Sequence, residues 1–561
     1  MVKNLKVSTI IAAVLCFVLT SGLLAGCTGS NVDNGTPGTT TAPGASSGSG
    51  TTTGPGATTG PGATTVPGAT TVPGASSEPM PVATTGPIEN QYTFSYPYST
   101  LDGVFTFRGN SYRTSPSFGT ANVMEKKLVK AWEAVTTGSL STWGSGSRWT
   151  GQPAIIKWSE DIKSKMNIYA KFKADKEFVE VISGNMNGKI YFFDLATGEE
   201  SRPPIFTGNP IKGSVSVDPR GYPLLYSGQG LNVGAKFGFR IFDLYKGKEI
   251  YFQNGRDAAA PRGWGAFDSS ALFSRTKDQL FVGGENGLLY KLNLNTKIDK
   301  QKGTISINPV VKKVNTYTRA IYGNGYGRLA TSDWIGIESS LVGYQESVFY
   351  SDNYGNVCCF DTNLNLKWHL KNVGDGDGTM TLQVENGKPY LFQSNQVDQE
   401  GTSGNCRVLK IDGTNGKIVW KKDIFCYSIL GENSSKGGTY SSNVFGKGKI
   451  SNLLILTVCR TPKLTSGQMI ALDKTTGKIV WTYDMDTYAW PSPVDVYDAQ
   501  GNPYIIQCDH NGNLLFIDGL TGKLLQKQSA DNNKIEASPS VFGNTLVFAT
   551  ITGKVLGYTI K

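Results

Sequence analysis

The sequence predicts an all-β protein, an eight-bladed β-propeller built from four-stranded antiparallel blades. Three observations support this fold class. A strand–turn–strand motif occurs eight times within residues 100–561, and the stretches between its copies lack helical periodicity. The copies lie roughly 52 residues apart on average, which is within the range of blade-type repeats.

The clearest copy of the motif is the segment 469–481. It opens with a short apolar run, passes through turn residues 473–477 and resumes a β-rich pattern at 479–481. Asp473 can accept hydrogen bonds from the next backbone amides, and Gly477 can take positive φ without a steric penalty. One such hairpin is marginally stable in water, so the repetition is what makes a fold. The anchor positions of the eight copies are 194, 243, 293, 361, 412, 473, 518 and 559.

Between anchors, each repeat contains further short strands joined by Gly, Asn and Asp turns, which gives four strands per repeat. Stacking such units radially leaves few exposed sheet edges. The last repeat stops immediately after its anchor strand, whereas residues 128–134 resemble the strand that follows the other anchors. We therefore expect this N-terminal strand to complete the last blade and to close the ring. Residues 91–561 would then form a single propeller domain.

The motif at 469–481 resembles the repeat of the pyrroloquinoline-quinone (PQQ)-like β-propellers, and the segment 107–113 resembles the one that opens such propellers. This family includes quinoprotein dehydrogenases and the propeller lipoprotein of outer-membrane protein assembly. The resemblance covers residues 100–561 and is more specific for fold than for function. It implies that Trp368, Trp420 and Trp481 pack between blades. It also implies structural roles for Asp412, Gly416, Asp473, Gly477, Asp518 and Gly522 in the repeat turns.

Residues 1–26 are predicted to be a lipoprotein signal peptide, with two lysines at the start and an apolar core over 7–24. The Leu-Ala-Gly-Cys sequence ending at Cys27 resembles the bacterial lipobox. The resemblance implies that the peptide before Cys27 is removed and that its thiol receives diacylglycerol. An ordinary signal peptide followed by a chance cysteine is the alternative. We expect acyl chains to attach the mature chain to the membrane without a spanning helix.

Residues 27–90 are predicted to be a disordered tether rich in Thr, Pro, Gly and Ser. Residues 52–75 are four copies of Thr-Thr-(Gly or Val)-Pro-Gly-Ala, and large apolar residues are almost absent from the segment. Such a composition cannot offset the entropy cost of ordering. A long stalk suits a domain that stands clear of a thick Gram-positive wall. We therefore expect an extracytoplasmic, membrane-anchored protein exposed at the cell surface.

Cysteine and histidine usage disfavours metal and hydrolytic centres. Apart from Cys16 and Cys27, the six remaining cysteines show no Cys-x-x-Cys spacing, and His369 and His510 are the only histidines. We therefore predict no metal site and no Ser-His-Asp triad. The net charge of +10 is spread along the chain without a basic run interleaved with aromatics. This pattern indicates solubility and attraction to anionic wall polymers, and it argues against nucleic-acid binding.

Candidate ligand-binding residues lie in the loops that precede the innermost strand of each blade. Strand alternation should project one position per repeat, two residues before a Ser-Pro-like step, to a common side of the ring. Aromatic rings beside charged groups can stack a sugar or a flat ring and hydrogen-bond its periphery. The alternative is that the tryptophans pack between blades while the charges pair across a wet channel. The predicted rim residues are Arg148, Trp149, Lys212, Trp264, Asp268, Trp334, Glu338, Asp377, Tyr440, Trp490 and Glu536, with Thr150 and Thr379 at the same position in their repeats.

Two features could support an enzyme. Cys358 and Cys359 are adjacent, and quinoprotein alcohol dehydrogenases carry a vicinal disulfide against their cofactor. Here the pair lies in the strand before Asp361, where neighbouring side chains point to opposite faces and a vicinal disulfide would distort the strand. The segment 374–378, Gly-Asp-Gly-Asp-Gly, could offer carboxylates to calcium, but it lacks a bidentate acid at a fixed offset and is interpreted as a loop.

We conclude from the sequence that the protein is a non-catalytic, monomeric, lipid-anchored binding module. Its predicted partners are the membrane, through the anchor, and a cell-wall polymer, another glycan or a protein. No cofactor is predicted. The first alternative is a PQQ- and calcium-dependent quinoprotein oxidoreductase. The second is an envelope assembly scaffold, similar to the outer-membrane assembly propeller.

Overall fold

The computed structural model describes residues 91–561 except 235, 331, 333 and 432–434. The predicted signal peptide 1–26, the lipidation site Cys27 and the tether 27–90 lie outside the described residues. Within the described part of the chain, no helix is both long enough and apolar enough to cross a membrane.

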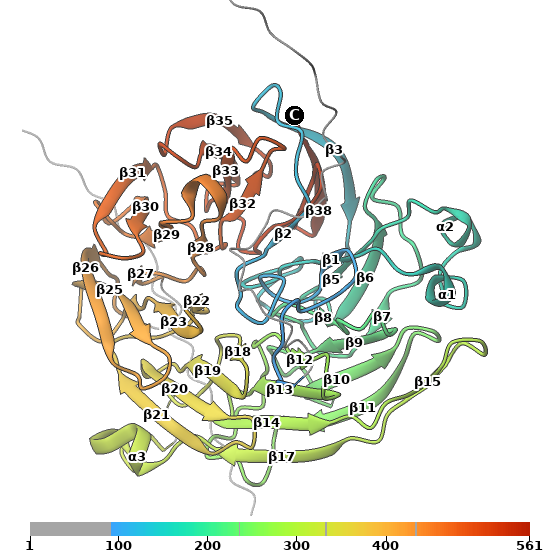
Figure 1. Cartoon of the computed structure of the whole chain (residues 1–561), viewed down its shortest axis with the longest axis horizontal. Helices are drawn as coiled ribbons and strands as arrows, with labels where there is room; N and C mark the ends of the chain where they lie inside the picture. Colours follow the sequence, from blue (N-terminus) through green and yellow to red (C-terminus); the bar gives the residue numbers. More distant parts are fainter. Residues whose placement is uncertain (1–90, 235, 331, 333, 432–434) are drawn as a thin grey trace, which may run out of the picture. The chain divides into compact units, whose positions relative to one another are not determined.

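Eight sheets surround a central axis, so the prediction of an eight-bladed β-propeller is confirmed (Figure 1). Blade 1 contains β4 (Ala154–Ile156), β5 (Glu180–Gly184), β6 (Lys189–Asp194) and β7 (Ile205–Phe206). Blade 2 contains β8 (Ser216–Val217), β9 (Leu224–Ser227), β10 (Gly238–Asp243) and β11 (Lys248–Asn254). Blade 3 contains β12 (Leu272–Ser274), β13 (Gln279–Gly283), β14 (Leu288–Asn293) and β17 (Val310–Asn315). Blade 4 contains β18 (Val342–Tyr344), β19 (Ser347–Ser351), β20 (Asn356–Asp361) and β21 (Leu366–Lys371).

The second half of the ring follows the same order from the inner to the outer strand. Blade 5 contains β22 (Thr381–Glu385), β23 (Lys388–Gln393), β25 (Ser403–Asp412) and β26 (Ile418–Tyr427). Blade 6 contains β28 (Val444–Phe445), β29 (Leu453–Cys459), β30 (Gly467–Asp473) and β31 (Ile479–Met485). Blade 7 contains β32 (Val494–Tyr497), β33 (Pro503–Cys508), β34 (Asn513–Asp518) and β35 (Leu524–Ser529). Blade 8 contains β36 (Ser540–Phe542), β37 (Thr545–Ala549), β38 (Lys554–Ile560) and β3 (Leu128–Val135).

The N-terminal strand closes the ring as predicted. β3 pairs antiparallel with β38, the last strand of the chain. Trp132 in β3 donates its indole N–H to Leu195 O at 2.9 Å, and a Cβ at Gly198 would lie 2.4 Å from the Trp132 ring. Blade 8 is therefore locked onto blade 1 by the same kind of tryptophan–glycine contact that the repeats use elsewhere.

The repeat residues take the structural roles that the resemblance implied. In blade 5, Asp412 Oδ1 accepts hydrogen bonds from the amide (3.0 Å) and hydroxyl (2.6 Å) of Thr414. Gly416, Gly477 and Gly522 all have positive φ. Because glycine lacks a Cβ, the tryptophan of the preceding blade can lie directly against the turn. The stacked pairs are Trp368 on Gly416, Trp420 on Gly477 and Trp481 on Gly522.

Several departures from four strands per blade come from insertions. The lead-in contributes β1 (Gly103–Val104) to blade 1 and β2 (Ser117–Phe118) to blade 8. β24 (Gln396–Val397) and β27 (Gly437–Gly438) extend the blade 6 sheet, and β15 (Lys297–Asp299) with β16 (Thr304–Ser306) forms a separate hairpin. The helices of the described residues are α1 (Glu160–Lys163), α2 (Ala170–Ala174) and α3 (Arg319–Tyr322), with 3₁₀ turns η1 (Gly323–Gly325) and η2 (Gly448–Ile450). Helices this short leave no periodic pattern in the sequence, which is why none was expected.

The lead-in segment 104–118 fills one end of the central axis. Its backbone carbonyls accept hydrogen bonds from inner strands around the ring, including Phe105 O from Val217 N (2.7 Å) and Tyr112 O from Leu382 N (3.0 Å). Further round, Pro116 O accepts from Val541 N at 3.2 Å. β1 and β2 accordingly appear at the centre of the ring in Figure 1. We call this end the plugged end, and the opposite end, where the inner strands begin, the rim end.

The adjacent cysteines lie where the strand pattern predicted. Both belong to β20, and each is buried, Cys358 in the core shared with blade 3 and Cys359 in the core shared with blade 5. All six cysteines of the described residues are buried and unpaired. Burial raises the pKa of the Cys359 thiol to about 12, so the thiol is protonated and unreactive at neutral pH.

Candidate binding site at the rim end of the axis

The rim end is formed by two sets of loops. The loops that precede the inner strands carry the predicted rim residues, and the turns between the second and third strands of the blades lie beside them. Because the lead-in fills the plugged end, a ligand that binds on the axis must reach it from the rim end. The described side chains here divide into an acidic half and an aromatic half.

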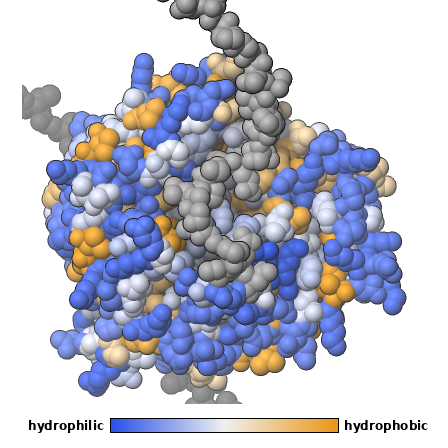
Figure 2. Space-filling model, viewed as in Figure 1, coloured by the Kyte–Doolittle hydropathy of each residue, from blue (hydrophilic) through white to orange (hydrophobic). Residues whose placement is uncertain are grey.

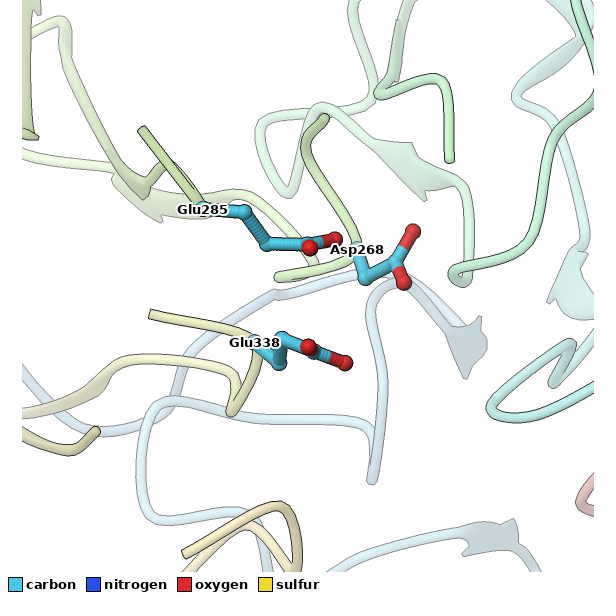
Figure 3. Close-up of side chains that lie close together, drawn as sticks. All are labelled: Asp268, Glu285 and Glu338. Carbon is cyan, nitrogen blue, oxygen red and sulfur yellow. The ribbon is translucent and has the colours of Figure 1, made fainter. Parts of the chain in front are cut away.

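The acidic half is built from blades 2, 3 and 4, and Figure 3 shows its three carboxylates, Asp268, Glu285 and Glu338. Asp268 precedes β12, Glu338 precedes β18, and Glu285 lies in the turn between β13 and β14. One carboxylate oxygen from each lies within 4.8 Å of the others. The ammonium of Lys212, which precedes β8, forms an ion pair with Asp268 and another with Glu338 at 3.2 Å. Trp264 donates its indole N–H to Glu285 Oε2 at 2.9 Å.

Burial sets the protonation of this half. Burial raises the pKa of Glu285 well above its usual range, and the charges of Glu338 and Asp268 raise it further. Burial also acts to raise the pKa of Glu338, but the Lys212 ammonium outweighs it and holds that pKa below its usual value. The carboxyl group of Glu285 therefore holds a proton, whereas that of Glu338 stays ionised.

Blade 5 extends the acidic half. Asp377 accepts a hydrogen bond from the side-chain amide of Gln396, and the amide of Asp375 donates to Asp398 Oδ1 at 3.2 Å. Burial, together with the nearby charge of Glu338, raises the pKa of Asp377 to about 8. Burial raises the pKa of Asp398 to about 6. The predicted loop 374–378 is thus a packed part of the rim that holds shared protons.

The aromatic half is built from blades 1, 6 and 7. Tyr440 and Trp490 stack with ring centroids 4.7 Å apart and an interplanar angle of 17°. Trp149 reaches across from blade 1 and donates its indole N–H to Tyr440 O at 2.9 Å. His510 packs on Trp490 at 5.1 Å and on Tyr488 at 4.6 Å. The rings of Tyr440, Trp490, His510 and Tyr488 thus contact one another in sequence, and Trp149 is joined to them by its hydrogen bond.

Cations border the aromatic half. Arg148 pairs with Glu536 at 2.9 Å, and Lys534 pairs with the same carboxylate at 2.5 Å. The Lys534 ammonium also lies 5.5 Å from the Trp490 ring centroid. Burial lowers the pKa of His510 to about 3, assisted by the charge of Lys534, so its imidazole is neutral. The fixed positive charges here belong to the lysine and arginine side chains.

The structure brings most of the predicted rim residues together. Trp334 is the exception, because it packs edge-on against Tyr354 at 6.1 Å, outside both halves. Thr150 and Thr379 use their hydroxyls between blades: Thr150 Oγ1 shares a hydrogen bond with Ser214 Oγ, and Thr379 Oγ1 accepts from Ser340 N, both at 2.8 Å. The charges pair, and Trp149 and Trp490 each contact Tyr440 of a different blade, as the alternative interpretation expected. Ligand binding at these residues stays a prediction.

Glu285 and His510 were missed by the sequence reasoning. Each immediately precedes an Asn-Gly pair, at 286–287 and 511–512, in the turn between the second and third strands of its blade. That turn lies at the rim end because it follows two antiparallel strands that start there. The residue before Asn-Gly was therefore a signal that could have found both side chains.

The carboxylates of Asp268, Glu285 and Glu338 are the described residues best placed to hold a cation. Lys212 already supplies positive charge between two of them. The trio therefore has an internal counter-ion.

Comparisons with known proteins agree with the fold. Residues 402–561 match the family model PQQ_2, described as outer membrane protein assembly factor BamB. No curated protein sequence matches the chain significantly.

Solved structures with the same fold include quinoprotein enzymes at low identity. A quinohemoprotein alcohol dehydrogenase from Pseudomonas putida is 12% identical with a TM-score of 0.53, and the match covers 82% of this chain and 80% of that one. The quinohemoprotein alcohol dehydrogenase from Comamonas testosteroni is also 12% identical, with a TM-score of 0.53, and the match covers 83% of this chain and 81% of that one. A europium-containing methanol dehydrogenase is 13% identical with a TM-score of 0.51, and the match covers 82% of this chain and 98% of that one. At this identity the similarity concerns the fold.

The rim residues do not fit PQQ, the cofactor that the fold family implies. PQQ is a flat quinone with three carboxylates, and the ionised Glu338 would face it with like charge. The adjacent cysteines, which would form a disulfide wall, lie in the third strand of blade 4 and point into two different cores.

Proposed function

We propose that this chain, whose repeats belong to the PQQ-like propeller family, is a non-catalytic binding protein that takes its ligand at the rim end. The observation that carries the proposal is the division of the rim. Tyr440 and Trp490 provide stacked rings on one side, and Asp268 and Glu338 provide carboxylates on the other. A sugar unit of a wall polymer or another glycan offers an apolar ring face and a hydroxyl edge, which match these two halves.

The rim side chains are held by contacts with one another, which suits a binding site. Trp149 is 5% exposed and is fixed by its hydrogen bond to Tyr440 O. Lys212 is fixed between Asp268 and Glu338, and its ammonium lies 5.6 Å from the Trp149 ring centroid. Groups that are already held in place lose little entropy when a ligand binds, so affinity is not spent on ordering the site.

A binding screen with purified wall polymers and glycans tests the proposal. We expect Trp490→Ala to weaken binding about tenfold, equivalent to ~1.4 kcal/mol, because it removes one ring of the stack. Trp264→Ala should weaken binding less, because it releases Glu285 without removing the stack. Phe206→Ala is the control, because Phe206 is an exposed ring on the outer strand β7 of blade 1. Binding that is unchanged in both tryptophan variants would refute the rim site.

We further propose that the propeller is attached to the membrane through a lipid on Cys27 and is displayed on the cell surface by the tether 27–90. The lipobox-like sequence before Cys27 supports this attachment. Cys27→Ser should release the protein from the membrane fraction into the medium, and mass spectrometry of the wild type should show an acylated N-terminal peptide. Retention of the Cys27→Ser variant in the membrane fraction would contradict it.

An envelope assembly scaffold is the second candidate. It is favoured by one observation, the family model described as an outer membrane protein assembly factor over residues 402–561. A scaffold of that kind should co-purify with an integral outer-membrane protein after crosslinking in the native host. Recovery of the protein in a cell with a single membrane would rule this candidate out.

A further inference from the structure

Two buried arginines of the lead-in are not explained by the repeat fold. Arg108 and Arg113 are both fully buried on the axis, among the largest buried side chains of the described residues. Both donate mainly to backbone carbonyls. A buried guanidinium is costly unless its donors are satisfied, so these contacts must matter to the structure.

Arg108 connects the strands that carry the aromatic half. Its guanidinium donates to Pro493 O at 2.5 Å and to Asn443 O at 2.8 Å, and its amide donates to Gln152 Oε1 at 3.1 Å. Each of these three acceptor residues lies three positions after a rim ring, as these pairs show: Gln152 after Trp149, Asn443 after Tyr440, and Pro493 after Trp490. Three residues of extended chain span about 10 Å. The Arg108 guanidinium therefore joins blades 6 and 7 behind the aromatic stack, and the backbone amide of the same residue joins the lead-in to blade 1.

Arg113 makes the equivalent connection behind the acidic half. Its Nε donates to Leu341 O at 2.8 Å, three residues after Glu338, and its Nη2 reaches Ser270 O at 3.3 Å, two residues after Asp268. Its Nη1 donates to Thr106 Oγ1 at 2.8 Å, within the lead-in itself. Arg113 therefore holds blades 3 and 4 together behind the carboxylates.

The guanidinium is suited to this task. Its N–H donors point outward in one rigid plane, so two carbonyls from different blades are held at a fixed separation. A lysine ammonium would keep the charge but is a compact group on a flexible stem. Loss of the fork should let the inner strands shift relative to each other, and the rim side chains shift with them.

We propose that Arg108 and Arg113 are positioning residues of the rim site, Arg108 for the aromatic half and Arg113 for the acidic half. The lead-in thus acts from the plugged end on the ligand site at the rim end. The role as ligand-site residues rests on the proposed function, but the positioning itself does not. It can be measured without any ligand.

Indole N–H resonances in a ¹H–¹⁵N NMR spectrum give the test, on protein with the 1–26 segment removed and the tether kept. The Trp149 and Trp490 indoles report on the aromatic half, and Trp264, which donates to Glu285, reports on the acidic half. Trp149→Phe, Trp490→Phe and Trp264→Phe assign the three signals. We expect Arg108→Lys to shift the first two signals and to leave Trp264 in place. We expect Arg113→Lys to shift the Trp264 signal and to leave the Trp149 and Trp490 signals in place.

Two milder variants keep the test decisive if a lysine variant fails to fold. Gln152→Met removes the acceptor of the backbone amide of Arg108. Thr106→Val removes one acceptor of the Arg113 guanidinium. Gln152→Met should shift the Trp149 indole signal and Thr106→Val the Trp264 signal, each by less than the lysine variants and without moving the signal of the other half. Shifts of all three indoles in every variant, or of none, would overturn the proposal. If the NMR pattern holds but glycan binding is unchanged in the Arg108 variant, positioning stands and the proposed function fails.

Discussion

Blades 5–8 and blades 1–4 reach the same strand order with different packing. In the C-terminal half, the turn glycines of blades 5, 6 and 7 each lie against a tryptophan of the preceding blade, namely Trp368 of blade 4, Trp420 and Trp481. The buried apolar residues of this half form separate clusters between neighbouring sheets. In the N-terminal half the anchors at Asp243 and Asn293 lack this pair, and one buried cluster runs continuously through blades 1–4.

The difference shows two ways to join small sheets. A tryptophan–glycine contact makes each interface a local unit, so every blade depends mainly on its neighbours. Where the contact is missing, the core is filled by inserted residues, among them Phe94 and Tyr98 of the N-terminal segment, Phe172 of α2 and Ile305 of β16. The motif is thus one solution for stability, and its loss in blades 2 and 3 is compensated by chain from outside the repeat. On the visible face the surface remains mainly hydrophilic with scattered apolar patches (Figure 2).

The largest expected effect is the loss of one interblade tryptophan. Trp420→Ala should lower the free energy of unfolding by about 3 kcal/mol, because it leaves a cavity between blades 5 and 6. Urea denaturation measures the change. Phe206→Ala, at an exposed position, should change stability by less than about 0.5 kcal/mol. Equal effects at the two positions would remove the distinction between the two halves.

Gly477→Ala tests the other side of the same contact. A Cβ there would lie 2.8 Å from the Trp420 ring at a φ of +69°, so we expect a loss of about 2 kcal/mol. Gly387→Ala is the matched control, with a φ of +76° and nothing within 4 Å of the added carbon. It should cost about 1 kcal/mol from backbone strain alone. A control as damaging as Gly477→Ala would show that strain, and not the ring contact, explains the glycine.

A smaller effect separates two tryptophans of the same kind. Trp420 donates its indole N–H to Lys474 O at 2.9 Å, whereas Trp481 Nε1 is buried without a hydrogen-bond partner. Trp420→Phe should therefore cost about 1 kcal/mol more than Trp481→Phe in denaturant unfolding. An equal cost would mean that the interblade contact is apolar packing alone.

The smallest effect concerns the pH dependence of the acidic half. The pKa of Asp377 is raised to about 8 in the folded protein, so folding binds a proton between the unfolded pKa near 4 and pH 8. Stability should therefore fall as pH rises through this window and should be highest at its acidic end. We expect Asp377→Asn to flatten the dependence of Tm between pH 5 and 8.5, by about 1–3 °C across the range. An unchanged slope would place the shared proton elsewhere.

Much of the fold could be predicted because the repeat is a local signal. The turn at Asp473 and Gly477 and the strands around it are specified by adjacent residues, and the period alone indicates a propeller. Ring closure was also predictable, because 128–134 repeats the strand that the last blade lacks. The extra strands β1 and β2 were not, since each contains two residues and leaves no pattern.

The rim was predictable only by position. Alternation within each inner strand placed Asp268, Glu338, Tyr440 and Trp490 on one side, and the structure brings these residues into two contacting groups. The contacts between them could not be predicted, because Lys212 and Glu338 are 126 residues apart in the sequence and Trp149 and Tyr440 are 291 residues apart. Trp334 shows the limit, because a loop residue can turn to either side of its blade.

By itself, the sequence determined the number of blades, their order and the strand–turn–strand motif, since each follows from residues close together in the chain. Only the tertiary structure decided that the lead-in fills one end of the axis and that Arg108 and Arg113 reach the strands behind the rim. It also decided the protonation of the carboxyls, because burial and neighbouring charge exist only once eight blades have closed. The turns and strands of each repeat are set by neighbouring residues in the sequence, whereas the rim site depends on contacts between blades.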